Sequence, residues 1–405
     1  MPVQARMNRR KRAPLACLFV LCASRIAAAQ MTPAEPIMLA GGAVTFGGDV
    51  SATIGPEDPG FFNYTDYEDS VLRMLRVDLT TSVRAGKHLS LLGELRSQNA
   101  RMPRAYALYF RVRPWADRRF DIQIGRIPPT FGAFPRRNYE TDNPLIGYPL
   151  AYQYLTSLRA DAIPASADEL VQMRGRGWLA TYSIPAVTSA PGVPLVNALR
   201  WDTGVQAHAA TDLVELTAAV TSGTLSNPLF RDDNAGRQFA ARAVVHPIAG
   251  LVVGASGAHG PFVSGEAARA AVGSEQDGAF SQTAWGGDVE YSRGYYVVRA
   301  ETIVSGWTMP MINDRLTSVA TSVEGRYKIR PGFYVAGRVD HLGFSQVATS
   351  TGSQTWDAPV TRFETGGGYS IQRNLLMKVT VQHDQRDGGR TRNASLVAGQ
   401  LVFWF

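Results

Sequence analysis

Apolar and polar side chains alternate with a period of two along most of this chain. In residues 75–84, Leu75, Val77 and Leu79 alternate with charged and hydroxyl side chains, and residues 377–384 repeat the pattern. Alternation of this kind is typical of a β-strand with one apolar and one polar face. No stretch carries a sustained apolar stripe at helical spacing. The sequence therefore predicts an all-β fold in which helix is the minority state.

Two kinds of connection separate these segments, and the short kind alternates with the long kind along the chain. Short turns fall at residues 85–87, 114–118, 210–211, 246–250, 292–294, 330–332 and 372–374. Long, mostly polar connections occupy residues 55–69, 127–197, 223–236, 259–280, 307–316, 344–358 and 386–392, with a shorter one near 99–103. Outer-membrane barrels have tight periplasmic turns at one end and longer external loops at the other. The order of the connections therefore predicts a transmembrane antiparallel β-barrel.

Counting on this basis gives sixteen strands. They are expected near residues 43–54, 70–84, 88–98, 104–113, 119–126, 198–209, 212–222, 237–246, 250–258, 281–292, 294–306, 317–329, 332–343, 359–371, 374–385 and 393–405. An even number places both termini on the periplasmic side. The segment Gly177–Ile184 looks strand-like but would break this parity, so we assign it to the long connection at 127–197. Fourteen or eighteen strands remain alternatives.

A soluble β-sandwich or solenoid would also alternate, because any half-buried antiparallel sheet does so. Charged residues recur, however, on the polar face of the expected strands: Arg76, Asp78, Glu94, Arg96, Arg111, Arg113, Glu301, Glu324, Arg326, Lys328, Arg338 and Asp340. In a soluble fold all of these side chains would have to face bulk water while the apolar faces found a core. Sixteen such strands without an obvious internal repeat fit a water-filled barrel better.

The first 29 residues have the three parts of a signal peptide. A basic stretch ends at Arg12, a short apolar core covers residues 15–23, and Ala27–Ala29 supply the small residues for cleavage before Gln30. The core is shorter than the roughly 20 residues that a membrane-spanning helix needs. We therefore divide the chain into a signal peptide, residues 1–29, and an outer-membrane β-barrel, residues 30–405.

Removal of this peptide changes the charge and the cysteine content. It holds six of the 41 basic residues and no acidic one, so 35 basic residues remain against 34 acidic ones and the formal net charge falls from +7 to +1. A nearly neutral chain gives no argument for nucleic-acid binding. Both cysteines, Cys17 and Cys22, also lie in the peptide, so we expect neither disulfides nor thiolate metal sites in the exported protein.

The last segment, Ala394–Phe405, has the features expected of a closing strand. Every second residue from Val397 to Phe405 falls on one apolar face. A terminal phenylalanine in this pattern resembles the signal read by the outer-membrane barrel assembly machinery. We expect this strand to pair with the first strand, near residues 43–54. Aromatic residues near other strand ends fit interfacial girdles: Trp115, Tyr291, Tyr295, Tyr296, Trp307, Tyr327, Tyr334 and Tyr369.

Three short motifs resemble the phosphate-selective porin family. Gly125–Gly132 is similar to the family's strand-to-loop pattern, Gly-x-x-x-x-Pro-Phe-Gly, with Thr130 where the proline before the phenylalanine is expected. Val298–Glu301 is similar to a family strand with an inward glutamate, and Arg338–Asp340 also fits. The resemblance implies a sixteen-stranded, trimeric channel for small anions, with a long third external loop folded into the pore. It would lie among outer-membrane lipid and lipopolysaccharide in a Gram-negative bacterium.

Residues 127–197 suit that loop, because a structureless connection of this length is rare unless it is functional. Porin selectivity needs rings of charge around a constriction. We expect the pore to be lined by Arg76, Asp78, Glu94, Arg96, Arg111, Arg113, Arg299, Glu301, Arg326 and Arg338 on the strands and by Arg136 and Arg137 on the loop. This mixture favours a polar pore with a weak preference for anions. An external solvated flap, and charges that only brace the wall, are the alternatives.

Two other functions are compatible with a barrel. A loop that filled the lumen would give a structural or adhesive barrel with a plugged pore. A barrel enzyme would need a histidine beside a nucleophile or a second acid. The six histidines, His88, His208, His246, His259, His341 and His383, form no metal-ligand or nucleophile-elbow motif. We therefore expect a channel rather than an enzyme, with no metal and no cofactor.

Overall fold

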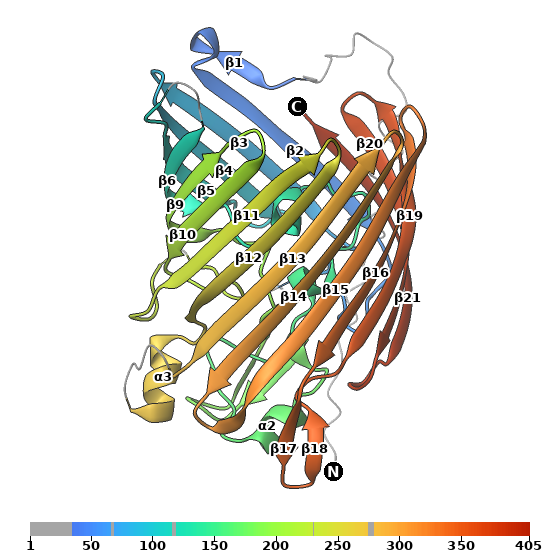
Figure 1. The fold of residues 1–405 in the computed structure, drawn as a ribbon. Helices are drawn as coiled ribbons and strands as arrows, with labels where there is room; N and C mark the ends of the chain where they lie inside the picture. The colour runs from blue at the N-terminus through green and yellow to red at the C-terminus, as the bar shows by residue number, and fades with distance from the viewer. Residues whose placement is uncertain (1–34, 66–68, 116–118, 230, 274–278) are drawn as a thin grey trace, which may run out of the picture. The chain divides into compact units, whose positions relative to one another are not determined.

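The computed structural model describes residues 35–405, except 66–68, 116–118, 230 and 274–278. The predicted signal peptide, with both cysteines, lies outside the described residues. The described residues form a closed antiparallel β-barrel whose strands tilt around a common axis (Figure 1). No helix among the described residues is long and apolar enough to cross a membrane.

Sixteen strands make the barrel wall, as the alternation predicted. They are β2 (Val44–Ile54), β3 (Leu75–Ala85), β4 (Leu89–Gln98), β5 (Arg104–Val112), β6 (Phe120–Ile127), β9 (Asp202–Ala210), β10 (Val214–Thr221), β11 (Gln238–Ile248), β12 (Leu251–Pro261), β13 (Ser281–Arg293), β14 (Tyr296–Met309), β15 (Ile312–Arg330), β16 (Phe333–Phe344), β19 (Val360–Gln372), β20 (Leu375–Arg386) and β21 (Asn393–Trp404). Each pairs with its neighbours in sequence, and a short strand β1 (Ile37–Leu39) pairs with the start of β2.

The barrel closes where the last strand meets the first. β21 pairs antiparallel with β2, so that Trp404 lies opposite Asp49 and Gly399 opposite Ile54. Phe405 extends this seam, because its N–H donates to the carbonyl of Gly48 at 3.0 Å and its own carbonyl accepts the Gly48 N–H at 3.1 Å. The predicted pairing of the closing strand is confirmed.

The two faces of the wall carry opposite kinds of side chain. On the outer face, Leu79 is 50% exposed, Leu108 is 49% exposed and Val397 is 56% exposed. On the inner face, Arg76 and Asp78, which alternate with such residues, are almost completely buried. A soluble protein buries its apolar side chains, whereas an apolar outer band is what lipid selects in a transmembrane barrel. The alternation in the sequence therefore separates an apolar outside from a polar inside.

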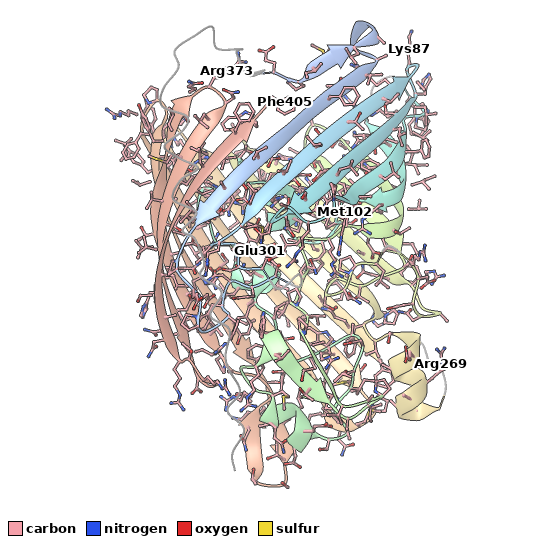
Figure 2. The ribbon with its side chains drawn as sticks, turned by 180° about the vertical axis from the view of Figure 1, so that it is seen from behind. Lys87, Met102, Arg269, Glu301, Arg373 and Phe405 are labelled. Atoms are coloured by element: carbon pink, nitrogen blue, oxygen red, sulfur yellow. The ribbon has the colours of Figure 1, made fainter. Side chains whose placement is uncertain are left out.

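Short turns and long connections lie at opposite ends of the barrel. Figure 2 shows Lys87, Arg373 and Phe405 at the short-turn end, with Arg269 at the other. Gly86 and Gly332 each adopt a positive φ of 78°, which glycine reaches without a steric penalty in a tight turn. The long-connection end carries helix α3 (Gly265–Val272) and a hairpin of β17 (Gln346–Thr349) with β18 (Gly352–Thr355).

One predicted connection differs from the expectation, and a second strand-like segment lies in the long connection as expected. Residues 307–316 were expected to form a long connection, but β14 and β15 run through them, with Trp307 opposite Leu316 and Met309 opposite Ile312. That prediction was wrong, because both Trp307 and Leu316 are fully buried and hold the hairpin beyond the apolar band. The strand-like segment Gly177–Ile184 contains β7 (Ala180–Tyr182), which pairs with β8 (Thr188–Ala190) and not with the barrel wall.

The connection between β6 and β9, residues 128–201, is called the inner segment below. It contains the 3₁₀ turns η3 (Phe134–Arg137) and η4 (Gly177–Leu179), the helices α1 (Leu150–Gln153) and α2 (Ala167–Gln172), and the β7–β8 hairpin. Its apolar side chains, such as Phe134, Leu150 and Leu158, are 0–1% exposed and belong to the main apolar cluster of the molecule. This cluster also includes Ala240, Ala284 and Ile303 of the barrel wall.

Candidate pore site

Four residues that the sequence predicted to line the pore form one ion-pair cluster on β3 and β4. Asp78 lies at its centre, with its carboxylate 2.7 Å from Nε of Arg76 and 2.6 Å from Nε of Arg96. Arg96 also contacts Glu94 at 3.0 Å, and Arg76 contacts Glu140 of the inner segment at 3.2 Å. The strands explain the first contacts, because Asp78 and Arg96 are direct cross-strand partners. We call these five residues the Asp78 cluster.

Tyrosines of the inner segment cover this cluster. The hydroxyl of Tyr139 donates to Glu94 at 2.6 Å, and the hydroxyl of Tyr148 donates to Glu140 at 3.0 Å. Burial raises the pKa of both hydroxyls, and the neighbouring carboxylate raises each further. Both tyrosines therefore stay protonated and remain hydrogen-bond donors to the carboxylates at neutral pH.

A second cluster centres on Glu324 of β15. Its carboxylate accepts from Arg299 of β14 at 3.1 Å and from Arg338 of β16 at 3.2 Å. Arg137 of the inner segment adds a third contact at 2.9 Å. The strand positions of Arg299, Glu324 and Arg338 follow from the ladder, which places Glu324 opposite both arginines. We call these four residues the Glu324 cluster.

Cationic side chains of the wall also donate to backbone carbonyls of the inner segment. Arg338 donates to Gly147 at 2.7 Å, and Arg362 donates to Tyr148 at 3.1 Å. The ammonium group of Lys378, itself fully buried, donates to three carbonyl oxygens of the segment, the nearest at 2.7 Å. Charge-assisted bonds of this kind are stronger than neutral ones. These side chains therefore fasten the inner segment to the wall.

Glu301 of β14 holds the start of the inner segment. Its Oε1 accepts the hydroxyl of Tyr152 at 2.6 Å and the backbone N–H of Ala133 at 2.8 Å. Burial raises the pKa of the Tyr152 hydroxyl well above its ordinary value, with the charge of Glu301 as the second cause. Tyr152 is therefore the donor in this contact.

Asp357, in the connection between β16 and β19, fastens the far part of the inner segment. Its carboxylate accepts the backbone N–H of Ser157 at 2.7 Å, of Gly175 at 2.8 Å and of Ala358 at 2.7 Å. Burial raises the pKa of this carboxyl, and the backbone donors oppose that rise. One side chain thus joins two turns of the inner segment to the barrel's long-connection end.

Three predicted residues lie outside both clusters and are only half-buried. Arg111 of β5 has its Nε 3.6 Å from the carboxylate of Asp121, and Arg113 follows directly after β5. Arg326 of β15 lies with its guanidinium carbon 5.9 Å from the ring centre of Tyr334. These residues stand nearer the short-turn end, where the inner face is less covered. Their role in lining a conducting path stays a prediction.

A cavity of about 230 Å³ lies between the inner segment and the wall. Its charged lining residues are Arg136, Arg137, Arg242, Arg299, Glu215, Asp288, Glu290, Glu301 and Glu324. Arg136 is the most accessible of these arginines, because its side chain is 50% exposed while it pairs with Glu215 at 3.4 Å. Four arginines thus face five carboxylates, a polar lining with almost balanced charge.

Sequence reasoning missed several residues of this site. Arg242 of β11 forms a two-point ion pair with Asp288 of β13, at 2.6 and 2.8 Å. Both alternate with outward residues in their strands, so extending the period of two would have found them. Glu140 carries no comparable signal, because it lies in an irregular connection and meets Arg76 only through the fold.

Three of the six histidines form one recurring cross-strand pair on the outer face. His259 pairs with Thr283, His341 with Thr361 and His383 with Ser395, each with Nδ1 2.9 Å from the hydroxyl oxygen. The single serine pair lies inside the β20–β21 ladder, where backbone N–H groups bind the neighbouring strand rather than an oxyanion. The two histidine–threonine pairs have the same distance as the histidine–serine pair. This shared geometry indicates a structural role for all three pairs rather than a catalytic one. Within the described part of the chain, no group of three His, Cys, Asp or Glu residues could hold a metal ion.

Comparison with known proteins gives likeness of fold but not of sequence. No family model matches this chain, and no curated protein matches it either. Among solved structures, OmpF of Salmonella typhi in complex with daunomycin has a TM-score of 0.55 at 10% identity, over 89% of this chain and 97% of that one. Outer-membrane-expressed OmpT of Vibrio cholerae has a TM-score of 0.54 at 12% identity, over 91% and 100%.

A third similar structure is described by its selectivity. The anion-selective porin from Comamonas acidovorans has a TM-score of 0.51 at 9% identity, over 89% of this chain and 99% of that one. At these identities the likeness concerns the backbone. The chain therefore has a closed sixteen-stranded barrel fold of the kind that outer-membrane porins share.

Proposed function

We propose that this protein is an outer-membrane porin of a Gram-negative bacterium, which lets small hydrophilic solutes diffuse passively across the membrane. The observation that carries the proposal is the barrel itself, with an apolar outer band, a charged inner face and a cavity of about 230 Å³ between the wall and the inner segment. Such a barrel crosses a bilayer without unsatisfied backbone groups, because every strand has two partners.

The inner segment sets the width of the diffusion path and the electrostatic field inside it. Its Arg136 and Arg137 face Glu215 and Glu324 of the wall, so a solute that passes meets groups of both signs within a few ångströms. Fixed charges of both signs around a narrow path orient hydrated solutes without binding them tightly. The ion pairs neutralise most of these charges, whereas the side chain of Arg136 stays 50% exposed, so we expect a weak preference for anions, including phosphate-like ions, rather than strict selectivity.

Conductance in a planar lipid bilayer tests the proposal. The folded protein without its signal peptide should give steady current steps. In a salt gradient, its reversal potential should be displaced slightly from zero towards the equilibrium potential of the anion. The neutralising variant Arg136→Gln should move that potential towards zero. Folded barrels that give no steps would contradict the proposal.

A plugged barrel with a structural or adhesive role is the second candidate. The burial of the inner segment favours it, because Leu150, Tyr152 and Leu158 are each 1% exposed inside the barrel. The same bilayer measurement separates the two functions. If the wild-type barrel gives no steps but a variant without residues 139–196 folds and conducts, the segment is a plug and not a constriction.

Assembly is the last part of the proposal. We infer a homotrimer that is inserted by the barrel assembly machinery and surrounded by outer-membrane lipid and lipopolysaccharide. The support is a structure of Vibrio cholerae OmpT described as a trimer form, which has a TM-score of 0.52 and 11% identity to this chain. Light scattering of the detergent-solubilised protein, corrected for bound detergent, should give the mass of three chains.

A further inference from the structure

His246 of β11 lines the cavity between the inner segment and the wall, and neither ion-pair cluster described above contains it. It faces the lumen, because it follows the buried inward residues Arg242 and Val244 at the strand period of two. Its Nε2 lies 3.2 Å from Oε1 of Glu215 on β10. The other oxygen of this carboxylate, Oε2, accepts from Nη1 of Arg136 at 3.4 Å. We call His246, Glu215 and Arg136 the Glu215 cluster.

The Glu215 cluster is open to the cavity. The side chain of Arg136 is 50% exposed, that of His246 is 36% exposed and that of Glu215 is 28% exposed. The neighbouring ion pair of Arg242 with Asp288 is only 4% and 7% exposed. A solute in the cavity therefore meets the Glu215 cluster directly, whereas the wall covers the neighbouring pair.

The acids of β13 beside His246 are already paired. Glu290 has its carboxylate 2.6 Å from Nε of Arg299 on β14. Asp288 has its carboxylate 2.6 Å from Nη1 of Arg242, which lies on the same strand as His246. Each of these acids has a cation of its own. Glu215 is therefore the carboxylate that a charged His246 would bind.

Two further strands complete the surroundings of His246. β12 presents an uncharged valine to the cavity. On β9, His208 has its Nδ1 3.0 Å from the hydroxyl oxygen of Thr217, and it does not line the cavity. Asp212, in the turn after β9, is 98% exposed and lies 4.0 Å from Arg119. Within the described lining of this cavity, His246 is thus the single histidine.

Protonation of His246 would change the charge that a solute meets. Histidine is the side chain whose charge ordinarily changes between about pH 5 and 8. With a neutral imidazole, four arginines face five carboxylates in the lining, and Glu215 compensates Arg136. A protonated His246 makes the two signs equal in number. It also shares the carboxylate of Glu215 as a second cation, which leaves the half-exposed Arg136 only partly compensated.

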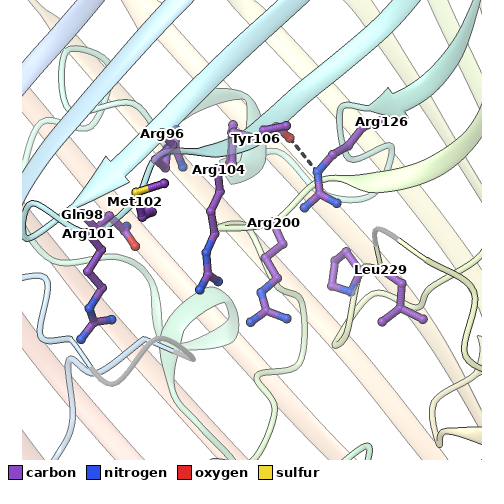
Figure 3. A pocket seen from close by; sticks show the side chains of 11 residues that line it. Arg96, Gln98, Arg101, Met102, Arg104, Tyr106, Arg126, Arg200 and Leu229 are labelled. Carbon is purple, nitrogen blue, oxygen red and sulfur yellow. Dashed lines mark hydrogen bonds between the residues drawn. The ribbon is translucent and has the colours of Figure 1, made fainter.

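Another cavity of the barrel lacks such a group. It measures about 440 Å³, lies where β4 and β5 adjoin the end of the inner segment, and has five arginines but no histidine and no carboxylate in its described lining. Its arginines have fixed partners, such as the backbone carbonyl of Tyr106, to which Arg126 donates at 2.9 Å along the dashed line of Figure 3. Its charge therefore stays the same between about pH 5 and 8.

We propose that His246 makes the ion preference of the pore depend on pH, so that the barrel prefers anions more strongly in acid. The inference rests on the proposed porin function, because it concerns the same diffusion path. One unit charge at about 6 Å in water changes the local concentration of a monovalent ion about threefold. We therefore expect the anion-to-cation permeability ratio to rise about threefold from pH 8 to pH 5.

Reversal potentials in planar bilayers of uncharged lipid, with a potassium chloride gradient at pH 8 and at pH 5, test the proposal. His246→Gln keeps a neutral donor beside Glu215, and its permeability ratio should stay near the wild-type pH 8 value at both pH values. His246→Lys carries a fixed charge and should show at pH 8 the ratio that the wild type reaches at pH 5. His208→Gln is the matched control, an inward histidine outside the cavity, and should keep most of the wild-type change.

Four results would overturn the proposal. The first is a wild-type ratio that does not rise in acid, and the second is a His246→Gln barrel that keeps the wild-type change. The third is a His208→Gln barrel that loses as much of the change as His246→Gln does. The fourth is a folded His246→Lys barrel with the wild-type ratio at pH 8, and this variant decides the question if His246→Gln does not fold. The porin proposal fails separately, if folded barrels give no current steps at either pH.

Discussion

Arg76 offers the sharpest test of what the inward charges do. The sequence places it on the pore face, but its side chain is 1% exposed because the inner segment covers it. Its guanidinium contacts Asp78 at 2.7 Å, Glu140 at 3.2 Å and the hydroxyl of Tyr148 at 2.9 Å. Replacement by glutamine keeps the approximate length but removes the charge.

The cost of Arg76→Gln follows from these contacts. Breaking a buried ion pair from one side typically costs about 3–5 kcal/mol, since the partner charge stays buried. Asp78 keeps its contact with Arg96 at 2.6 Å, so we expect the lower end of this range, about 3 kcal/mol. Arg136→Gln is the matched control, because Arg136 is half exposed and its pair with Glu215 contributes about 1 kcal/mol or less.

Two measurements on both variants decide whether Arg76 stabilises the fold or sets the ion selectivity. Urea unfolding in lipid vesicles, followed by tryptophan fluorescence, should show the loss of stability in Arg76→Gln and almost none in Arg136→Gln. Reversal potentials should show the opposite ranking, with a shift in Arg136→Gln and a wild-type value in Arg76→Gln. An Arg76→Gln barrel as stable as the wild type, or one with the larger shift in potential, would refute the structural role of this arginine.

Two further predictions concern the inner segment and the outer band. Asp357→Ala removes the acceptor of three backbone N–H groups. The loss of even one charge-assisted bond of about 1.5–3 kcal/mol should speed tryptic cleavage after Arg174 or Arg176 about tenfold or more. Asp387→Ala, which removes only the exposed contact of Arg174 at 3.2 Å, should leave cleavage at the wild-type rate. Equal rates in both variants would count against the role of Asp357 in fastening the inner segment. Val397→Lys places a charge on the apolar outer face and should destabilise the barrel in vesicles by about 2–4 kcal/mol. Gln385→Lys, on the same wall but beyond the apolar band, should cost much less, and similar losses for the two lysines would argue against a lipid-facing band.

Strand positions could be predicted from the sequence because the membrane imposes the same local alternation of side chains on every strand. Lipid outside and polar groups inside require alternation in every strand, whatever the rest of the fold does. The seam between β2 and β21 followed from the even strand number and the apolar face of Val397–Phe405. The exception, residues 307–316, extends beyond the apolar band, where Asn313, Asp314 and Arg315 carry no alternation that lipid would enforce.

The environment of the inward charges was not readable in the same way. The period of two placed Arg76, Glu94 and Arg338 on the inner face, but it says nothing of what covers them. Their cover comes from the inner segment, through contacts such as Arg76 to Glu140, 64 residues apart, and Arg338 to Gly147, 191 residues apart. No local pattern encodes pairs at such separations.

The sequence by itself determined an outer-membrane barrel, its closing strand and the apolar face that meets lipid, and it favoured sixteen strands over fourteen or eighteen. Each of these depends on residues next to one another along a strand. Only the tertiary structure decided which charges brace the inner segment, which border the cavity and which meet where β4 and β5 adjoin the end of the inner segment. Arg96, Arg104 and Arg200 share one pocket because two strand ends and a long connection converge there, and that convergence depends on packing across the whole barrel.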